Sequence, residues 1–256
     1  MTPIPDLSSW STSITDVKDS SIRYRGVPIE DLIDDGDLAT TLWLVLFGGT
    51  PGTGSADALR RALIAALDHG VSAPSTLVAR VTASTRSAVP FAVAGGLMAF
   101  GGPAHGGAAE GAANLFVEIA ASDDHETGAR DVVRRLLDRG ERLPGYGHPY
   151  HRRDPRVPGL MGGVAEDRTH RRIARLCEAA LRAESGRDLR MNADAAVAAL
   201  LLDAGLGTAD ITLVTGLGRA FGLAAHAREE LMEEKPFRAP SLDTIRFVSP
   251  AKQEEA

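Results

Sequence analysis

The sequence has a single cysteine, Cys177, among its 256 residues. One thiol can form neither an intrachain disulfide nor a cysteine-based metal cluster, which excludes the disulfide-rich secreted domains. We therefore expect a protein of the reducing cytoplasm. The sequence also lacks the pattern of a signal peptide, which is a basic N-terminal segment followed by an apolar stretch. No apolar run approaches the roughly 20 residues of a membrane span. Neither export nor a membrane partner is expected.

A surplus of positive charge is missing as well. The formal net charge is −6 and the isoelectric point is near 5.7. Proteins that bind nucleic acids hold the phosphates with surplus Lys and Arg, so no nucleic-acid partner is expected. An anionic small molecule would have to meet locally clustered arginines.

Strand-like alternation is scarce, whereas apolar residues recur at helical spacing along most of the chain. The sequence predicts one short strand, at 22–24, and disorder only after Ser249. Helices are expected at 37–47, 55–68, 75–89, 93–100, 108–121, 127–139, 165–184, 194–204 and 208–233. The helix ending at 184 is charged around a narrow apolar stripe, which predicts a surface helix. The segment from Ala195 to Leu202 is apolar on all sides, which predicts a buried helix with Asp194 at its start. The fold is predicted to be all-α.

Polar side chains concentrate in PGYGHPYHRRDPR, residues 144–156, which contains two histidines, three arginines and an aspartate. Gly145, Gly147, Pro149 and Pro155 prevent a regular helix, so a turn-rich loop is expected whose polar groups can converge on a ligand. Imidazole beside guanidinium indicates proton transfer next to an anion site.

A second candidate site is FGGPAHGGAAE, residues 100–110, where glycines flank His105 on both sides. At the start of a helix, a histidine among glycines exposes its backbone to a ligand, and the helix dipole lowers its pKa. Such a neutral imidazole can donate a hydrogen bond to an enolate oxygen.

Three motifs, GGPAHGGAAEG, PGYGHPYHRRDPR and MNAD at 191–194, occur in the order and approximate spacing of the citrate synthase family. The opening TSITDVKDSSIRYRGVPIEDL, LDHG at 67–70 and GLGRAFGLAAHAREE are also similar, so the sequence resembles this family along almost its whole length. The resemblance implies an all-helical subunit with a large domain, residues 1–105 and 205–256, and a smaller mobile domain, residues 106–204. It also implies a site between the domains and at least a homodimer.

The resemblance implies a catalytic trio of His105, His148 and Asp194. In the condensing direction, the match to Asp194 removes a proton from acetyl-CoA and the match to His105 hydrogen-bonds the enolate oxygen. The match to His148 activates the carbonyl of oxaloacetate. The substrate would be a coenzyme A thioester together with a di- or tricarboxylate, and neither a permanently bound cofactor nor a metal is expected.

Further residues match ligands of the two substrates. The matches to ligands of the substrate carboxylates are His69, Arg156 and Arg219, and Arg238 matches an arginine donated across a dimer interface. The matches to the CoA-binding region are Pro144, Gly145, Tyr146, Gly147 and Arg152.

The departures from the synthases favour cleavage. Citrate synthases are longer, with an N-terminal helical portion that this sequence lacks, and many have glutamate where LDHG has Gly70. The spacing from His148 to Arg156 is also one residue tighter. These features resemble the stand-alone citryl-CoA lyases and the lyase module of ATP-citrate lyase, so the expected reaction is retro-aldol cleavage of citryl-CoA to acetyl-CoA and oxaloacetate. The alternatives are a citrate or 2-methylcitrate synthase and a non-catalytic CoA-binding homologue.

Several candidates also have a purely structural interpretation. His69 could close a helix ahead of Gly70, and Asp194 could be only a helix N-cap. Arg219 could meet an internal carboxylate instead of a substrate. Arg238 precedes Ala239, whereas the family has arginine directly before proline. A zinc site formed by His148, His151 and His105 is disfavoured, because Pro149 interrupts the spacing and no rigid carboxylate is near.

Overall fold

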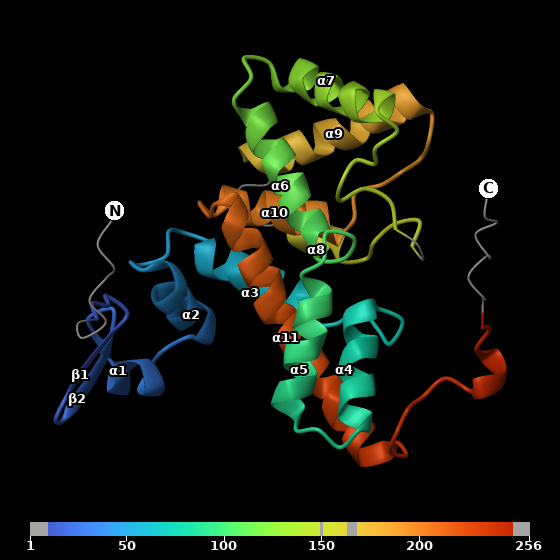
Figure 1. Cartoon of the computed structure of the whole chain (residues 1–256). Helices are drawn as coiled ribbons and strands as arrows, with labels where there is room; N and C mark the ends of the chain where they lie inside the picture. The colour runs from blue at the N-terminus through green and yellow to red at the C-terminus, as the bar shows by residue number, and fades with distance from the viewer. Residues whose placement is uncertain (1–9, 149–150, 163–167, 248–256) are drawn as a thin grey trace, which may run out of the picture. The chain divides into compact units, whose positions relative to one another are not determined.

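The computed structural model describes residues 10–148, 151–162 and 168–247. Helices dominate these residues, so the expected all-α class is confirmed (Figure 1). The chain divides into two compact units: unit 1 comprises Met1–Ala66 and Gly106–Gly218, and unit 2 comprises Leu67–His105 and Arg219–Ala256. The two units are groups of residues that pack together, whereas the expected small domain is a group of residues that moves as one body. The division into 1–105 with 205–256 and 106–204 therefore stays a prediction.

Unit 1 begins with an antiparallel meander of three strands, β1 (Thr15–Lys18), β2 (Ser21–Tyr24) and β3 (Val27–Pro28). The sequence predicts only the middle strand, because the flanking strands have four and two residues and carry no apolar alternation. The helices of unit 1 are α1 (Ile29–Asp34), α2 (Leu38–Phe47), α3 (Ser55–Ala66), α6 (Gly107–Ala120), α7 (His125–Asp138), α8 (Val157–Met161), α9 (Thr169–Ser185), α10 (Ala193–Asp203) and the start of α11 (Thr208–Glu233). The sequence misses α1 and α8, which are too short to show a helical period.

Unit 2 contains α4 (Pro74–Ser84), α5 (Val89–Phe100), the rest of α11 and a 3₁₀ turn at Leu242–Thr244. Helices α4 and α5 pack against each other. The expected helix 75–89 is five residues too long, and α5 begins at Val89, ahead of the expected 93. Pro90 explains the early start of α5, because proline is favoured in the first turn of a helix. Helix α4 ends at Ser84 and does not continue through Arg86. Arg86 instead adopts a left-handed turn with φ of 67°.

Helix α10 is the centre of unit 1, where it packs against α3, α6, α8 and α9 (Figure 1). Every residue from Ala195 to Leu202 is at most 8% exposed, which confirms the predicted buried helix. Small alanines let the neighbouring helices approach closely, and the leucines fill the space between them. The backbone of α10 is therefore held on all sides by apolar contacts.

Helix α9 has the predicted amphipathic character, with Ile173 and Cys177 fully buried on its inner face. It ends at Gly186, whose φ of 65° allows a left-handed C-cap. The sequence is wrong about Arg171, which a surface helix would expose but which is only 3% exposed here. Residues 165–167 of the expected helix 165–184 lie outside the described residues, as does the tail after Ser249. No helix among the described residues is long and apolar enough to cross a membrane.

The packing of α10 predicts a large penalty for truncating its core side chains. Leu201 is 0% exposed, so Leu201→Ala should lower the free energy of unfolding by about 2–5 kcal/mol through lost burial and a residual cavity. Leu213→Ala is the control, because Leu213 is 42% exposed in the same unit. Urea unfolding can be followed by the fluorescence of Trp43, which lies in the same core cluster. Equal losses in both variants would contradict this account of the core.

Candidate active site

The loop at 144–148 is hydrogen-bonded to the segment that leads into α10. Gly147 N–H donates to the Arg190 carbonyl at 2.7 Å, and Asn192 N–H donates to the Gly145 carbonyl at 2.9 Å. The Asn192 side-chain amide donates to the Gly147 carbonyl at 2.9 Å. Tyr146 also forms an antiparallel bridge with Met191. These bonds fix the segment that carries His148 to the segment that carries Asp194.

Two glycines make this pairing possible. Gly145 and Gly147 have φ of 81° and 83°, a left-handed conformation that other residues rarely adopt. A Cβ on Gly145 would lie 2.5 Å from the Cβ of Ala195, so the loop backbone lies directly against α10. The Tyr146 hydroxyl donates to the Ala174 carbonyl of α9 at 2.7 Å, and burial raises the pKa of this phenol. Tyr146 thus anchors the loop as a neutral phenol.

His148 is oriented by the loop that follows it. The backbone N–H of His151 donates to His148 Nδ1 at 3.2 Å, and the two imidazole rings lie 4.5 Å apart between centroids. A neutral ring that accepts at Nδ1 carries its proton on Nε2. Burial lowers the pKa of His148, and the neighbouring His151 and Arg156 lower it further. The ring is therefore neutral near pH 7 and can donate a hydrogen bond to a substrate oxygen.

Asp194 lies in the first turn of α10 but does not cap it, so the interpretation of this residue as only an N-cap is wrong. The N-cap is Asn192, whose side-chain oxygen accepts from Asp194 N–H at 2.9 Å. Asp154 accepts from Ala193 N–H at 2.9 Å. Because Asn192 and Asp154 satisfy these backbone donors, the carboxylate of Asp194 is not needed for capping.

Arg156 forms a fork with Asp154, a residue to which the sequence assigns no role. Its Nε and Nη2 donate to the two carboxylate oxygens at 2.9 and 2.7 Å, and its Nη1 donates to the Ala65 carbonyl at 3.2 Å. Burial opposes ionisation of Asp154, but the hydrogen bonds from Arg156 outweigh it and lower the pKa to about 2. Asp154 thereby joins Arg156, the N-cap residue of α8, to the start of α10. An aspartate two residues before an arginine is the signal that could have identified it.

A cavity of about 890 Å³ opens beside the same loop in unit 1. It is lined by Tyr146, Gly147 and His148, together with the ends of α7 and α9 and the arginines Arg142 and Arg187. The sequence does not predict these two arginines. Arg152 does not line the cavity: its side chain is 86% exposed and lies 3.4 Å from Asp188. Pro144 lies against Gly111 of α6.

In unit 2, His105 is held by Ser75 and Phe100. Its Nε2 lies 2.8 Å from the Ser75 hydroxyl, and its ring meets the Phe100 ring edge-on at 5.1 Å. Burial lowers the pKa of His105, and the Arg219 guanidinium lowers it further. The predicted direction of the shift is thus confirmed, and the causes that the structure shows are burial and Arg219, which the sequence does not predict. The sequence also misses Ser75.

Arg219 and His69 belong to the same unit. Arg219 is 5% exposed, and its guanidinium carbon lies 5.5 Å from the centroid of the Phe100 ring, a cation–π contact. Phe100 therefore contacts both His105 and Arg219. His69 is half-buried and lies three residues beyond the end of α3 at Ala66, so the interpretation that it closes a helix in its last turn is wrong.

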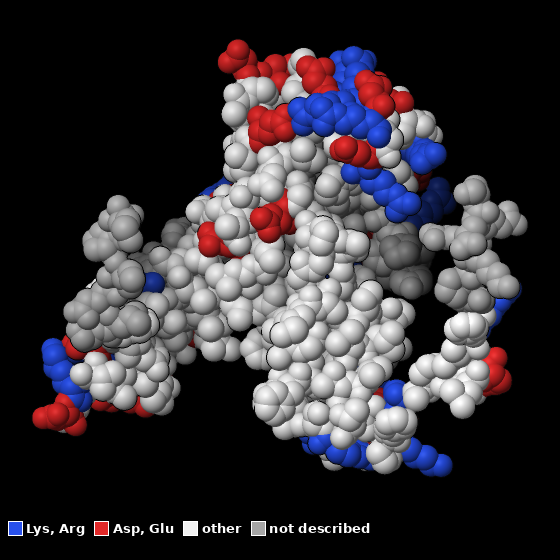
Figure 2. Space-filling model, in the orientation of Figure 1, with Lys and Arg blue, Asp and Glu red and all other residues white. Residues whose placement is uncertain are grey.

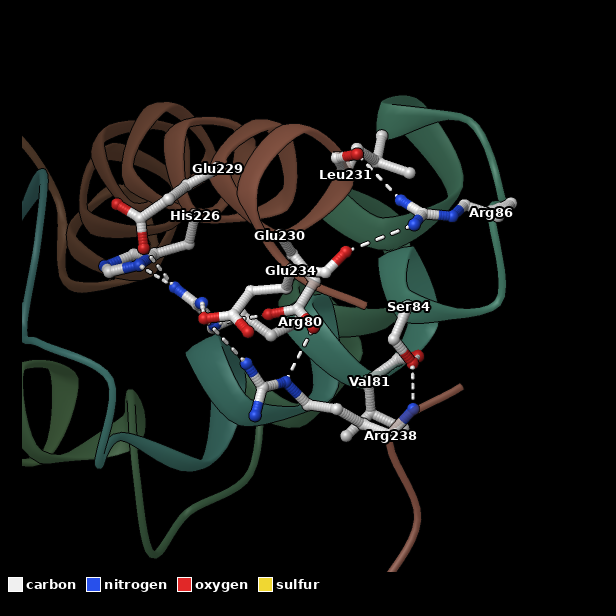
Figure 3. Close-up of polar contacts among 10 residues, drawn as sticks. All are labelled: Arg80, Val81, Ser84, Arg86, His226, Glu229, Glu230, Leu231, Glu234 and Arg238. Atoms are coloured by element: carbon white, nitrogen blue, oxygen red, sulfur yellow. Dashed lines mark hydrogen bonds and ion pairs between the residues drawn. The ribbon is translucent and has the colours of Figure 1, made fainter. Parts of the chain in front are cut away.

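Arg238 lies in a network of charged side chains between α4 and α11 (Figure 3). It donates to Glu230 at 2.6 Å and lies 3.2 Å from Glu234, and its backbone N–H donates to Ser84 at 3.0 Å. Glu230 is fully buried and also accepts from Arg80 at 2.8 Å. Within one chain, Arg238 thus neutralises a buried carboxylate, and its donation to a partner subunit stays a prediction.

The residues of the predicted trio are divided between the two units. His148 and Asp194 lie on paired segments of unit 1, whereas His105 belongs to unit 2. The meeting of all three stays a prediction. Among residues 10–148, 151–162 and 168–247, no group of three His, Cys, Asp or Glu side chains could hold a metal ion.

The chain is similar to several known enzymes. Citryl-CoA lyase from Hydrogenobacter thermophilus superposes with a TM-score of 0.84 and 31% identity, over 96% of this chain and 97% of that one. A 2-methylcitrate synthase of Shewanella oneidensis is 32% identical over 237 residues, which are 90% of this chain and 60% of that protein. A putative citrate synthase 2 of Mycobacterium tuberculosis is 34% identical over 142 residues, which are 55% of this chain and 37% of that protein.

The chain thus spans only part of the length of these two synthase relatives. The family model of the citrate synthase C-terminal domain matches residues 46–240, a range that includes every predicted site residue from His69 to Arg238. With its mostly helical fold and its likeness to both lyase and synthases, the chain belongs to the citrate synthase family.

Proposed function

We propose that the protein is a citryl-CoA lyase, which cleaves citryl-CoA to acetyl-CoA and oxaloacetate. The observation that carries this proposal is the likeness to the lyase of Hydrogenobacter thermophilus, which extends over nearly the whole of both chains at a TM-score of 0.84. The cleavage moves one proton from the citryl hydroxyl to the methyl carbon of acetyl-CoA, so no further reactant is needed. The single buried Cys177 is in keeping with a cytoplasmic setting.

Each member of the trio has a role that suits its surroundings. His148, neutral and oriented by His151, hydrogen-bonds the oxygen that is a hydroxyl in citryl-CoA and a carbonyl in oxaloacetate. His105, whose pKa burial lowers, donates to the enolate oxygen that develops on the thioester. Asp194 delivers the proton to the enolate carbon, a role that suits a carboxylate in the first turn of a buried helix.

The remaining site residues hold the two parts of the substrate. Carboxylates of the citryl group are assigned to His69, Arg156 and Arg219, since imidazole and guanidinium groups donate hydrogen bonds to carboxylates. Arg156 would bind through the N–H groups that its fork with Asp154 leaves over. The CoA portion is assigned to the PGYG loop at 144–147 with Arg152. The 890 Å³ cavity beside that loop adds Arg142 and Arg187 as candidate partners for CoA phosphates.

The second candidate is the reverse reaction, a condensing synthase. The likeness to the 2-methylcitrate synthase of Shewanella oneidensis over 90% of this chain favours it. A Nε2-protonated His148 also suits the activation of a carbonyl acceptor. The two directions use the same residues, so kinetics must distinguish them.

An assay of both directions tests the proposal. Purified protein mixed with citryl-CoA should release oxaloacetate, detected by NADH oxidation with malate dehydrogenase. Free CoA from oxaloacetate with acetyl-CoA or propionyl-CoA, without release of oxaloacetate from citryl-CoA, would establish a synthase instead. No turnover in either direction with CoA still bound would favour a non-catalytic homologue.

Substitution of the proposed acid should separate catalysis from binding. Asp194→Ala should lower kcat by about 10²–10⁴-fold, the usual contribution of a positioned proton donor. CoA affinity, measured by calorimetry, should stay nearly unchanged, because Asp194 acts only during proton transfer. Asp131→Ala, at an exposed site on α7, is the control and should behave as the wild type. Full activity of Asp194→Ala would remove Asp194 from the mechanism.

We also propose that the protein forms a homodimer through unit 2. Phe91, Met98 and Phe221 are 70%, 81% and 60% exposed on α5 and α11, and the visible surface over α4 and α5 carries almost no charge (Figure 2). The surface over α7 and α9, in contrast, is covered by Lys, Arg, Asp and Glu. A surface with few charges and exposed large apolar side chains is typical of subunit interfaces.

Light scattering after gel filtration tests the dimer. The wild type should elute at twice the chain mass of 26.9 kDa, and Phe91→Asp should shift the protein toward the monomer. Val17→Asp replaces an apolar residue that is 68% exposed in unit 1, and it should leave the dimer intact. A monomeric wild type at micromolar concentration would refute the proposal.

A further inference from the structure

A second cavity of unit 1, which we call the α3 pocket, has a volume of about 390 Å³. Its walls come from the start of α3, the residue after α8, the start of α9 and the end of α10. None of the predicted catalytic, carboxylate-binding or CoA-binding residues lines it. Three arginines do: Arg61, Arg168 and Arg171.

Arg171 is the buried member of this group. Only 3% of the residue is exposed, and its Nε donates to Asp203 at 3.1 Å. Its terminal nitrogens Nη1 and Nη2 have no hydrogen-bond partner among the residues that the structure describes. These two nitrogens are not among the buried atoms that lack a partner, so they are accessible from the pocket that Arg171 lines and can donate to a ligand there.

The carboxylate of Asp203 does not serve the other arginines. It accepts four hydrogen bonds, two from His170 at 2.9 Å and two from Arg171 at 3.1 and 3.3 Å. Asp203 and Arg171 therefore form a neutral pair that fixes the end of α10 to the start of α9. The charge of the pocket depends on the remaining groups.

Among the described residues that line the pocket, three arginines face two carboxylates, Asp57 and Asp203, which leaves one positive charge in excess. Arg168 donates to the backbone carbonyl of Asp203 at 2.5 Å, and the described residues give it no carboxylate partner. Arg61 shares Asp57 with Arg60, so two guanidiniums face a single carboxylate. The first turn of α3, a helix of 12 residues, adds the positive end of its dipole. This excess is notable in a chain whose net charge is −6.

We propose that the α3 pocket binds a phosphate group through Arg61, Arg168 and Arg171. Guanidinium groups bind phosphate with two parallel hydrogen bonds, and a helix N-terminus favours the same anion. A volume of about 390 Å³ exceeds that of a lone phosphate and leaves room for a small organic group. The ligand is therefore inorganic phosphate or a phosphomonoester of a small metabolite.

Calorimetry with the full chain tests the pocket at constant ionic strength. Inorganic phosphate and glycerol 3-phosphate are the probes, and potassium chloride controls for general salt effects. Arg168→Gln and Arg61→Gln should each weaken binding at least tenfold. Arg60→Gln is the matched control, because Arg60 also pairs with Asp57 but does not line the pocket, and it should bind as the wild type does.

The outcomes separate the ligand sources and the alternatives. Tighter binding of the ester supports a metabolite, whereas equal or weaker binding supports the free ion. Phosphate affinity that is unchanged in Arg168→Gln and Arg61→Gln but lost in Arg187→Gln would assign the anion to the 890 Å³ cavity and refute the proposal. Absence of binding at millimolar concentrations would also refute it. CoA binding serves as the folding check for Arg168→Gln and Arg61→Gln, which should both retain it.

Discussion

The backbone hydrogen bonds between 145–147 and 190–192 are the constraint on which the proposed chemistry of unit 1 depends. They join two segments far apart in the sequence, so that His148 and Asp194 are carried by one hydrogen-bonded pair of strand-like stretches. Gly145 lets this pair lie against α10, and α10 is buried from Ala195 to Leu202. The positions of both residues therefore depend on the most tightly packed part of the unit.

The groups that support the site are as informative as the site residues. Asn192 caps α10, Asp154 holds both Arg156 and the first N–H of α10, and Ser75 contacts His105. In each case a polar side chain satisfies a neighbour that would otherwise be costly to bury. The proposed catalytic and carboxylate-binding groups are thereby oriented before any substrate binds.

The sequence predicts the all-α class, the buried helix and the motif residues, because apolar periodicity and glycine patterns are local signals. It fails where the outcome depends on long-range partners. The sequence predicts a surface position for Arg171, because the sequence does not show that Asp203 lies beside it. The role of Asp154 depends on its contacts with both Arg156, at the start of α8, and the first N–H of α10. Ser75 lies 30 residues from His105, a distance at which a single sequence carries no signal.

The pairing of 145–147 with 190–192 also bears on how this family can change its length. The intervening chain leaves and returns through a fixed pair of segments, so residues can be gained or lost between them, outside the parts that contact α10 and His148, without displacing His148 relative to Asp194. The region of α8 and α9 lies in the chain between these two hydrogen-bonded segments. Diversification of substrate range could proceed there while the reacting groups keep their positions.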